Sequence, residues 1–509
     1  MQVTDLDEDH LEKILSELED YQISHGSLLK IPRSLTDFES PVAVARPIGV
    51  SVLPTTFPGP QFEQALDVQT LFNELYINVA EDDAWLETMV QKLGEADEFA
   101  TKLWSIWQRV KDEGEVQQLR CGIFRSDYML HYGQDSTGSN QTISHELIVP
   151  SLTNSKLKQV EFNTYSCAGG THANIVANMH RYLAGKGIHG TARLPANQAI
   201  RSIVDVLVGA HQAYGLSADQ KRQTAILMTV QPNNVNICDE RPIEYALSEC
   251  DPPIVLYRVE FSDEVMRKCR LGLNRELLLQ PAAKSETVEI SVVYQRAGYD
   301  SHEYDEIGID ARFMLERSRA IKCPTILSHI AGFKKVQQEL SRLDNLNRFL
   351  APEKASILAQ TFMPQYPIDT SVEGMHSLHL ALDEWSAENY ILKPSLEGGG
   401  HNIYGKDIPA FLRAIPKRQW SKYILMERIH PPMVHGVLVS PVLTHKGPVV
   451  SELGVLGTCI WRRNEQQENE RVEILRNTIG GWTFKTKPHD VQEMSVVKGY
   501  GCFDCPSFP

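Results

Sequence analysis

Residues 390–405 read Tyr-Ile-Leu-Lys-Pro-Ser-Leu-Glu-Gly-Gly-Gly-His-Asn-Ile-Tyr-Gly, a window that combines a short strand with a glycine-rich loop. A short β-prone run ends at Lys393 and is followed by a loop that carries Glu397 and a glycine triplet. The triplet consists of Gly398, Gly399 and Gly400. Consecutive glycines let backbone N–H groups converge on a phosphate, because no Cβ atom blocks its approach. Since the lysine adds a mobile positive charge and the carboxylate suits magnesium, the window predicts a clamp for a metal-bound triphosphate.

The alternative interpretation of this loop is a flexible surface turn, which a glycine run alone would favour. The combination of lysine, glutamate, glycines and Asn402 directly after a strand favours the clamp. No Gly-Lys-Ser or Gly-Lys-Thr follows the glycines, so the loop is not a Walker A motif.

The composition is that of an ordinary globular protein with a net negative charge. The chain has 509 residues, 42% hydrophobic and 23% charged, and a formal net charge of −15. This length predicts two or three subdomains. The negative charge disfavours nucleic acid or an anionic membrane as a partner. No apolar stretch reaches the roughly 18 residues that span a bilayer.

The expected location is the cytoplasm. The first nine residues are acidic and polar, which is wrong for a signal or transit peptide. Nine scattered cysteines in a chain of this length do not form a disulfide framework, and the lone Cys-x-x-Cys at 502–505 is interpreted as structural.

Two further stretches carry charged or amide side chains on predicted strands. Residues 121–124 are β-prone and end at Arg125, two residues before an aspartate. In residues 158–164, Glu161 and Asn163 fall on one face of a strand, where a carboxylate and an amide oxygen suit hard cations. The alternatives are a surface ion pair for the first stretch and a solvated strand face for the second.

Together these motifs resemble the ATP-grasp ligases, in the version carried by eukaryotic glutathione synthetases. The resemblance covers nearly the whole chain from about residue 62. The matching strings are Phe-Arg-Ser-Asp-Tyr at 124–128, Val-Glu-Phe-Asn-Thr at 160–164, Arg-x-Gly-Tyr at 296–299, Gly-x-Lys-Lys-x-Gln-Gln at 332–338 and the glycine loop, in which His401 replaces an asparagine.

The resemblance implies a role for each matching residue. For magnesium on ATP it implies Glu161, Asn163 and Glu397. For ATP itself it implies Glu161, Lys334, Lys393, Gly398, Gly399, Gly400, Asn402, Tyr404, Met426, Glu427, Arg428, Ile429, Glu452 and Lys487. For the substrates it implies Arg125, which would face the reacting carboxyl group as the catalytic residue, with Ser166, Ala168, Asn234, Glu240, Arg296, Tyr299, Lys485, Val496 and Val497.

The substrate side departs from the family pattern at several positions. Ala168 stands where a serine is usual, and Asn234 and Glu240 stand where the family has a glutamate and a glutamine. Lys485 replaces an arginine, which keeps the charge but loses the bidentate fork. The closing loop at 493–499 lacks the paired glycines and contains a lysine. These changes leave the donor acid and the acceptor amine open.

The predicted fold class is α/β, an ATP-grasp fold with an inserted α/β substrate-binding subdomain and peripheral helices. The expected divisions are an N-terminal helical and ATP-grasp part at 1–223, the inserted subdomain at 224–331, and an ATP-grasp part with the glycine loop and a C-terminal lid at 332–509. Periodicity predicts helices over 7–22, 62–82, 84–110, 173–183 and 310–322.

The expected function is that of an ATP-dependent carboxylate–amine ligase. It would join γ-glutamylcysteine and glycine through an acyl phosphate, giving glutathione, ADP and phosphate, with Mg²⁺ as cofactor. Two alternatives stand beside it: a divergent ligase for another acid and amine in specialised metabolism, and a nucleotide-binding scaffold without catalysis. The resemblance also implies a homodimer, while the partners expected are ATP and small amino-acid or peptide substrates.

Overall fold

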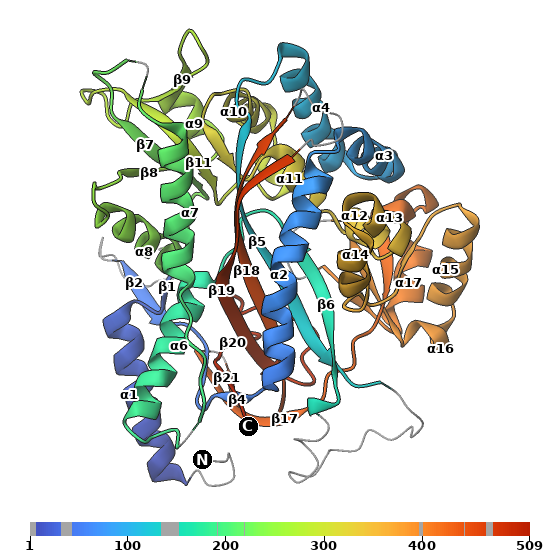
Figure 1. The fold of residues 1–509 in the computed structure, drawn as a ribbon. Helices are drawn as coiled ribbons and strands as arrows, with labels where there is room; N and C mark the ends of the chain where they lie inside the picture. Colours follow the sequence, from blue (N-terminus) through green and yellow to red (C-terminus); the bar gives the residue numbers. More distant parts are fainter. Residues whose placement is uncertain are drawn as a thin grey trace.

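Three β-sheets, joined and covered by helices, make up most of the molecule (Figure 1). The computed structural model describes residues 7–31, 43–133, 152–190, 192–217, 219–395, 401–441, 443–464 and 472–509. Both α and β elements alternate along the described chain, so the predicted α/β class is confirmed.

The central sheet has seven strands in the order β17-β3-β20-β19-β18-β5-β6. The bounds are β17 (Val434–Ser440), β3 (Val50–Ser51), β20 (Cys502–Phe503), β19 (Val472–Pro488), β18 (Leu443–Arg463), β5 (Leu119–His131) and β6 (Lys156–Asn163). The pairs β19–β18, β18–β5 and β5–β6 are antiparallel. The sheet therefore brings together segments from both ends and the middle of the chain.

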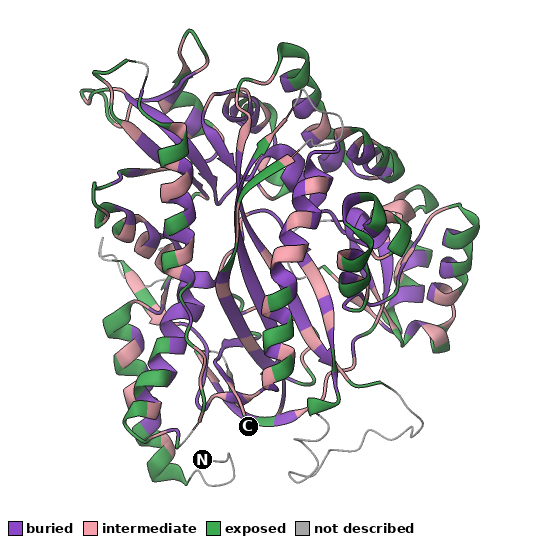
Figure 2. Ribbon diagram, viewed as in Figure 1, coloured by how far each residue is buried: buried purple, intermediate pink, exposed green. Residues whose placement is uncertain are grey.

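Successive side chains of β18 point to opposite faces of the sheet, and each face is covered by a different apolar core. Val455 and Trp461 belong to one apolar core, whereas Leu456 and Ile460 belong to another. The first core contains α2 (Gly59–Ala80), and the second contains α7 (Ala199–Tyr214). In Figure 2 the middle of the sheet and the helix faces turned toward it are buried. The sheet is thus apolar on both sides, as expected for a layer between helices.

The second sheet is built from residues 224–323. Its order is β8-β7-β11-β10-β9, with β12 pairing β11. The bounds are β7 (Thr224–Val230), β8 (Leu256–Glu260), β9 (Cys269–Leu271), β10 (Leu277–Leu279), β11 (Val288–Gln295) and β12 (Ile321–Cys323). Helices α8 (Ile237–Ser248), α9 (Asp263–Lys268) and α10 (Glu306–Glu316) accompany it. Every residue of β11 is buried, and its polar side chains have buried partners: Glu289 accepts from Tyr214 and Ser217, and Gln295 accepts from Tyr165.

The helix predicted over 310–322 is wrong at its C-terminal end. Helix α10 ends at Glu316, and Ile321–Cys323 form β12, which pairs in parallel with β11. The apolar residues of 320–323 fit a helical period as well as a short buried strand, and only the pairing partner distinguishes the two.

The third sheet has the order β13-β16-β14-β15. Its strands are β13 (Gln365–Pro367), β16 (Tyr423–Glu427), β14 (Tyr390–Pro394) and β15 (Ile403–Tyr404). Helices α15 (Val372–Leu382), α16 (Glu384–Ala387) and α17 (Asp407–Ala414) share a separate apolar core with it. The glycine loop connects β14 to β15, and its residues 396–400 lie outside the described residues.

The remaining elements complete the described part of the chain. They are α1 (Glu8–His25), β1 (Leu28–Ile31), β2 (Val44–Pro47), β4 (Thr55–Thr56), α3 (Asp83–Leu93), η3 (Gly94–Ala96), α4 (Glu98–Glu113), α6 (Gly170–Gly185), η4 (Ser301–Glu303), α11 (Ile326–Ala331), α12 (Lys334–Leu340), α13 (Leu343–Phe349), α14 (Pro352–Ala359), η5 (Lys417–Lys422) and β21 (Pro506–Ser507). The helical stretch predicted over 84–110 is two helices, because Asp97 accepts from the N–H of Ala100 and starts a new one.

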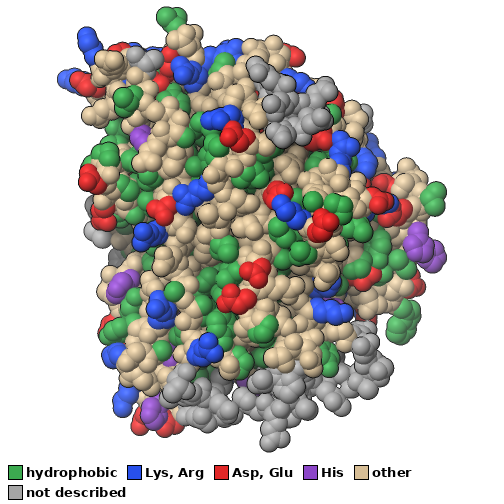
Figure 3. Space-filling view, viewed as in Figure 1, with side chains coloured by type: hydrophobic (Ala, Val, Ile, Leu, Met, Phe, Trp, Pro, Cys, Tyr) green, Lys and Arg blue, Asp and Glu red, His purple; other side chains and the backbone are tan. Residues whose placement is uncertain are grey.

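The surface carries charges of both signs. On the face shown in Figure 3, acidic and basic side chains are interspersed among polar and apolar ones. Within the described residues, the structure has no helix that is both long and apolar enough to cross a membrane.

Candidate functional site

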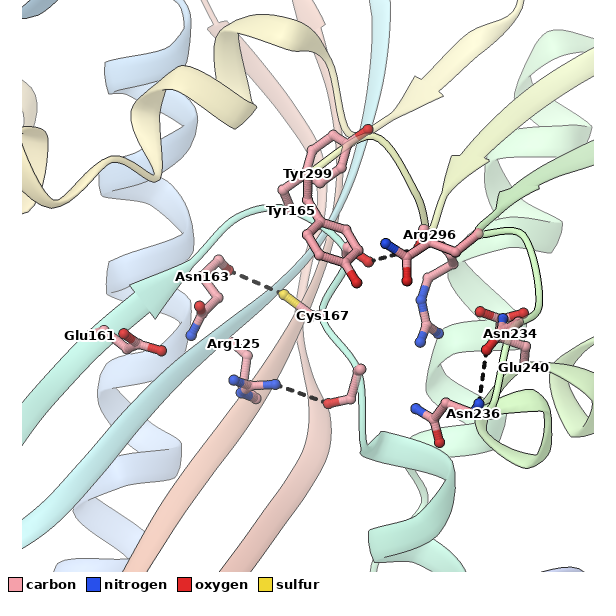
Figure 4. A pocket seen from close by; sticks show the side chains of 13 residues that line it. Arg125, Glu161, Asn163, Tyr165, Cys167, Asn234, Asn236, Glu240, Arg296 and Tyr299 are labelled. Atoms are coloured by element: carbon pink, nitrogen blue, oxygen red, sulfur yellow. Dashed lines mark hydrogen bonds between the residues drawn. The ribbon is translucent and has the colours of Figure 1, made fainter. Parts of the chain in front are cut away.

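A pocket of about 270 Å³ opens between the central sheet and loops of the second sheet. Its lining comprises Arg125, Glu161, Asn163, Tyr165, Ser166, Cys167, Ala168, Gln231, Asn234, Asn236, Glu240, Arg296 and Tyr299. Figure 4 shows Arg125, Glu161 and Asn163 on one side, and Asn234, Glu240 and Arg296 on the other. The first side comes from β5 and β6, and the second comes from the loop after β7, the first turn of α8 and the loop after β11.

Arg125 is held in place by a carboxylate two residues along its own strand. Its Nε and one terminal nitrogen donate to the two oxygens of Asp127 at 2.7 and 2.8 Å. Its other terminal nitrogen donates to the carbonyl of Ala168 at 2.9 Å. Burial disfavours the guanidinium charge, but Asp127 raises the pKa of Arg125 above its ordinary value. The pocket therefore receives a fixed, permanently charged guanidinium, whose planar fork is occupied by Asp127.

Asn163 is oriented by the same carboxylate. Its Nδ2 donates to Asp127 Oδ2 at 3.2 Å. Because a carboxylate only accepts hydrogen bonds, the amide must turn its nitrogen toward Asp127, and its oxygen is the atom that can face a cation. Glu161, two residues earlier on β6, lines the same pocket. This donor set of one carboxylate and one amide oxygen fits a hard divalent cation.

Lysines converge on Glu161 from two other elements. Lys334, at the start of α12, forms an ion pair with it at 2.9 Å. Lys393, on β14, donates to the carbonyl of Val160 at 2.8 Å. Burial opposes ionisation of Glu161, yet the ammonium groups of Lys334 and Lys393 lower its pKa far below the usual range. Burial also lowers the pKa of Lys393 to about 8.

Lys487 and Lys485 lie on β19, which follows the glycine-loop region in the sequence. Lys487 donates to the carbonyl of Val491, and burial lowers its pKa to about 8. Lys485 forms an ion pair with Glu452 of β18 at 2.5 Å, and burial raises the pKa of that glutamate. Both lysines are incompletely solvated cations, which a polyanionic ligand would stabilise.

The segment that follows the glycines contacts the C-terminal loop. Glu397, Gly398, Gly399 and Gly400 lie outside the described residues. Immediately after them, the N–H of Asn402 donates to Glu493 Oε1 at 3.1 Å, and Asn402 Nδ2 donates to the hydroxyl of Tyr404 at 3.4 Å. Val496 of the C-terminal loop is buried, whereas Val497 is exposed.

Four of the residues that the resemblance implies for ATP, Met426, Glu427, Arg428 and Ile429, lie on and after β16. Met426 and Ile429 are buried, whereas Arg428 is exposed. Glu427 accepts a hydrogen bond from the Tyr366 hydroxyl at 2.8 Å. As far as the described residues define it, the pocket is lined by none of the four.

The far end of the pocket contains two buried ion pairs side by side. Arg296 donates to Asp239 at 2.8 Å, and Arg258 donates to Glu240 at 2.6 Å. Asp239 also accepts from the backbone N–H groups of Gly169 and Thr171. These bonds tie the loop after β6 to the first turn of α8, so both charged residues that face the pocket are held rigidly.

The structure thus brings together most of the residues predicted for the substrates. Seven of the ten line the pocket: Arg125, Ser166, Ala168, Asn234, Glu240, Arg296 and Tyr299. Lys485, Val496 and Val497 do not belong to its lining. The sequence reasoning missed Tyr165, Cys167, Gln231 and Asn236. Position could have indicated them, since each lies within three residues of a predicted residue and follows a strand.

Comparison with known proteins gives one consistent result. The family described as "Eukaryotic glutathione synthase, ATP binding domain" matches residues 8–508. The glutathione synthetase large chain of Schizosaccharomyces pombe is 30% identical over 98% of this chain and 98% of its own length. The glutathione synthetase of Mus musculus is 30% identical over 98% of this chain and 97% of its own.

A solved structure shares the fold. The apo form of a glutathione synthetase-like effector from Globodera pallida superposes with a TM-score of 0.72 at 19% identity, covering 99% of this chain and 98% of that one. At this identity the likeness concerns the fold alone.

Proposed function

Because this chain belongs to the eukaryotic glutathione synthase family, we propose that it joins γ-glutamylcysteine and glycine in an ATP-dependent reaction. The fold class is ATP-grasp, and the chain is a ligase that forms an amide bond. One observation supports the assignment of the substrates most directly. The pocket places the fixed guanidiniums of Arg125 and Arg296 on opposite sides of a space that adjoins the Glu161–Lys334 pair.

The proposed chemistry has two steps. The γ-phosphoryl group of ATP passes to the carboxylate of the acid, giving an acyl phosphate and ADP; the amine then attacks the acyl carbon and phosphate leaves. Both steps concentrate negative charge on phosphoryl oxygens, which fixed positive groups stabilise. We assign this role to Lys334, Lys393 and Lys487, and we assign to Arg125 the orientation of the acid's reacting carboxylate.

Water must be excluded, since an acyl phosphate hydrolyses. The bond from Asn402 to Glu493 links the segment after the glycine loop to the C-terminal loop. We propose that the C-terminal loop, with Val496 and Val497, closes over the reactants.

We propose Mg²⁺ as the cofactor. Glu161 and the amide oxygen of Asn163 would hold it, together with Glu397, which lies outside the described residues. When bound, the ion would neutralise charge on the ATP phosphates. The Asp127 contact supports this assignment, because it leaves the Asn163 oxygen, rather than the nitrogen, to face a cation.

The test is phosphate release by the purified protein with Mg-ATP, γ-glutamylcysteine and glycine, combined with mass detection of the product. We expect release that requires both substrates and a product with the mass of glutathione. The variant Glu161→Gln, purified identically, should lose the activity, which excludes a copurifying enzyme. Binding of ATP without release from this substrate pair would contradict the proposed substrates and favour another acid or amine.

Three further expectations stay predictions: division at residues 223 and 331, assembly as a homodimer, and a cytoplasmic location. Residues 224–323 contribute all strands of the second sheet, which supports the first. Sedimentation of the purified protein would measure the second, and imaging of the tagged full-length protein the third.

A further inference from the structure

Arg312 lies on α10, outside the pocket, and is completely buried. Its Nε donates to Glu316 Oε1 at 2.8 Å. One terminal nitrogen donates to the hydroxyls of Tyr165 and Tyr304 at 2.7 and 3.1 Å. The other terminal nitrogen has no hydrogen-bond partner among the described atoms, and the guanidinium carbon lies 5.1 Å from the centre of the Tyr165 ring.

Both tyrosine hydroxyls also form hydrogen bonds with the end of β11 and the loop that follows it. The Tyr165 hydroxyl lies 2.7 Å from Gln295 Oε1 and 2.9 Å from the carbonyl of Ala297, so it shares one proton between two acceptors. The Tyr304 hydroxyl donates to the carbonyl of Gly298 at 2.7 Å. These acceptors flank Arg296 and precede Tyr299, the two residues that this loop contributes to the pocket.

The same tyrosine begins the opposite wall. Tyr165 is followed by Ser166, Cys167 and Ala168, all of which line the pocket. Ser166 has a φ of 48°, a strained value for a residue with a side chain, and its hydroxyl donates to the carbonyl of Arg296 at 3.1 Å. The carbonyl of Ala168 accepts from Arg125. One buried guanidinium therefore contacts groups that fix both walls.

The chemistry of the two hydroxyls favours this arrangement. A tyrosine hydroxyl has one proton to donate and lone pairs that accept, so each can accept from Arg312 and donate to a carbonyl. Burial raises the pKa of Tyr304 to about 12. Glu316 compensates the buried positive charge. A lysine could not reach these partners simultaneously, because it presents a point charge in place of a planar fork.

We propose that Arg312 is a positioning residue for the acid substrate, acting through the hydroxyls of Tyr165 and Tyr304 on the two loops that present Arg296, Tyr299 and Ser166. It touches no substrate itself. The inference rests on the proposed function for its kinetic consequence, whereas its structural part is independent of which acid binds.

The kinetic test compares Arg312→Lys and Tyr304→Phe with wild type. Charge-assisted and neutral hydrogen bonds correspond to roughly tenfold and fivefold effects on an equilibrium. We expect the KM for the acid to rise about tenfold in Arg312→Lys and about fivefold in Tyr304→Phe. The KM for ATP should change less than twofold. Equal increases in both KM values, or an unchanged KM for the acid, would overturn the proposal.

Arg120→Lys is the matched control. Arg120 is also a buried arginine with carboxylate partners, Glu115 at 2.5 Å and Glu81 at 3.7 Å, but it contacts neither loop. Its variant should lower the unfolding temperature without a selective effect on the acid. If Arg312→Lys does not fold, Tyr304→Phe carries the test, because it removes only one oxygen atom.

Hydrogen–deuterium exchange separates this proposal from the proposed function. Peptides covering residues 164–169 and 295–300 should exchange faster in Arg312→Lys than in Arg120→Lys, with or without activity. A wild type inactive on γ-glutamylcysteine would refute the proposed function, while faster exchange in these two peptides would still support the positioning role. Unchanged exchange in both would refute the role itself.

Discussion

Asp127→Asn is the most informative single change in the pocket region. The carboxylate is 2% exposed and accepts two hydrogen bonds from Arg125 and one from Asn163. An asparagine has nearly the same shape, but only one of its two terminal atoms accepts. The variant therefore leaves the guanidinium of Arg125 without a counter-charge and with half of its fork unmatched.

The expected loss of stability follows from burial. Removing one partner of a buried ion pair costs about 3–5 kcal/mol. Since the Arg125 side chain is 15% exposed and one acceptor remains, we expect the low end, about 3 kcal/mol. Asp263→Asn is the control: Asp263 and its partner Arg267, 3.0 Å apart, are 70% and 63% exposed, so about 0–1 kcal/mol should be lost.

A second effect concerns the metal. In Asp127→Asn, the new amide nitrogen can donate to the Asn163 oxygen, which turns the nitrogen of Asn163 toward the pocket. Loss of such an outer contact typically lowers metal affinity by about 10- to 100-fold. The Mg²⁺ concentration for half-maximal activity should accordingly rise at least about tenfold.

Urea titration and the magnesium dependence of phosphate release would measure the two effects. A loss of stability no greater than that of Asp263→Asn would refute the assigned ion pair. An unchanged magnesium dependence would refute the assigned orientation of Asn163.

Three other predictions concern two lysines near the pocket, a buried aspartate and one residue of the pocket wall. ATP binding, measured by calorimetry, should weaken as pH rises from 7 to 9, because Lys393 and Lys487, each with a pKa of about 8, lose their protons. The variant Lys393→Arg should reduce this pH dependence. If the ATP affinity of the wild type does not change with pH, both lysines are excluded from the phosphate site. Burial raises the pKa of Asp504 from 3.8 to about 6, so its contribution to stability is present below pH 3.8 and is lost as pH rises through 6. Asp504→Asn should therefore stabilise the protein by about 3 kcal/mol at pH 8 and by less than about 1 kcal/mol at pH 4 in urea titrations; a gain that is independent of pH would contradict this. Ala168→Ser should lower the KM for γ-glutamylcysteine about fivefold by returning a hydroxyl to the pocket, and no change would show that this wall does not contact the acid.

The strands that line the pocket could be predicted from the sequence, because the alternation that indicates a strand is a property of a short window. Alternation in residues 158–164 placed Glu161 and Asn163 on one face before any pairing was known. The end of α10 was not predictable in this way. Residues 321–323 are compatible with a helix or a strand, and contact with β11 decides between them.

The partners of the charged residues depended on pairing between distant segments. The register of β5 and β6 sets Arg125 opposite Asn163, and Asp127 opposite Glu161. No spacing in the sequence contains that information, because a shift of one residue would turn each side chain to the other face. Arg312 carried no signal at all: in the sequence it is one of several charged residues on a helix, and its partners Tyr165 and Tyr304 lie 147 and 8 residues away.

The sequence by itself determined the family, the α/β class and the identity of most residues around the pocket, since glycine triplets, strand alternation and matching motifs are properties of short windows. The tertiary structure alone decided which charges neutralise one another, which lysines lose their hydration, and which way the amide of Asn163 faces. Burial and register fix these properties, and both arise only when segments far apart in the chain are packed together.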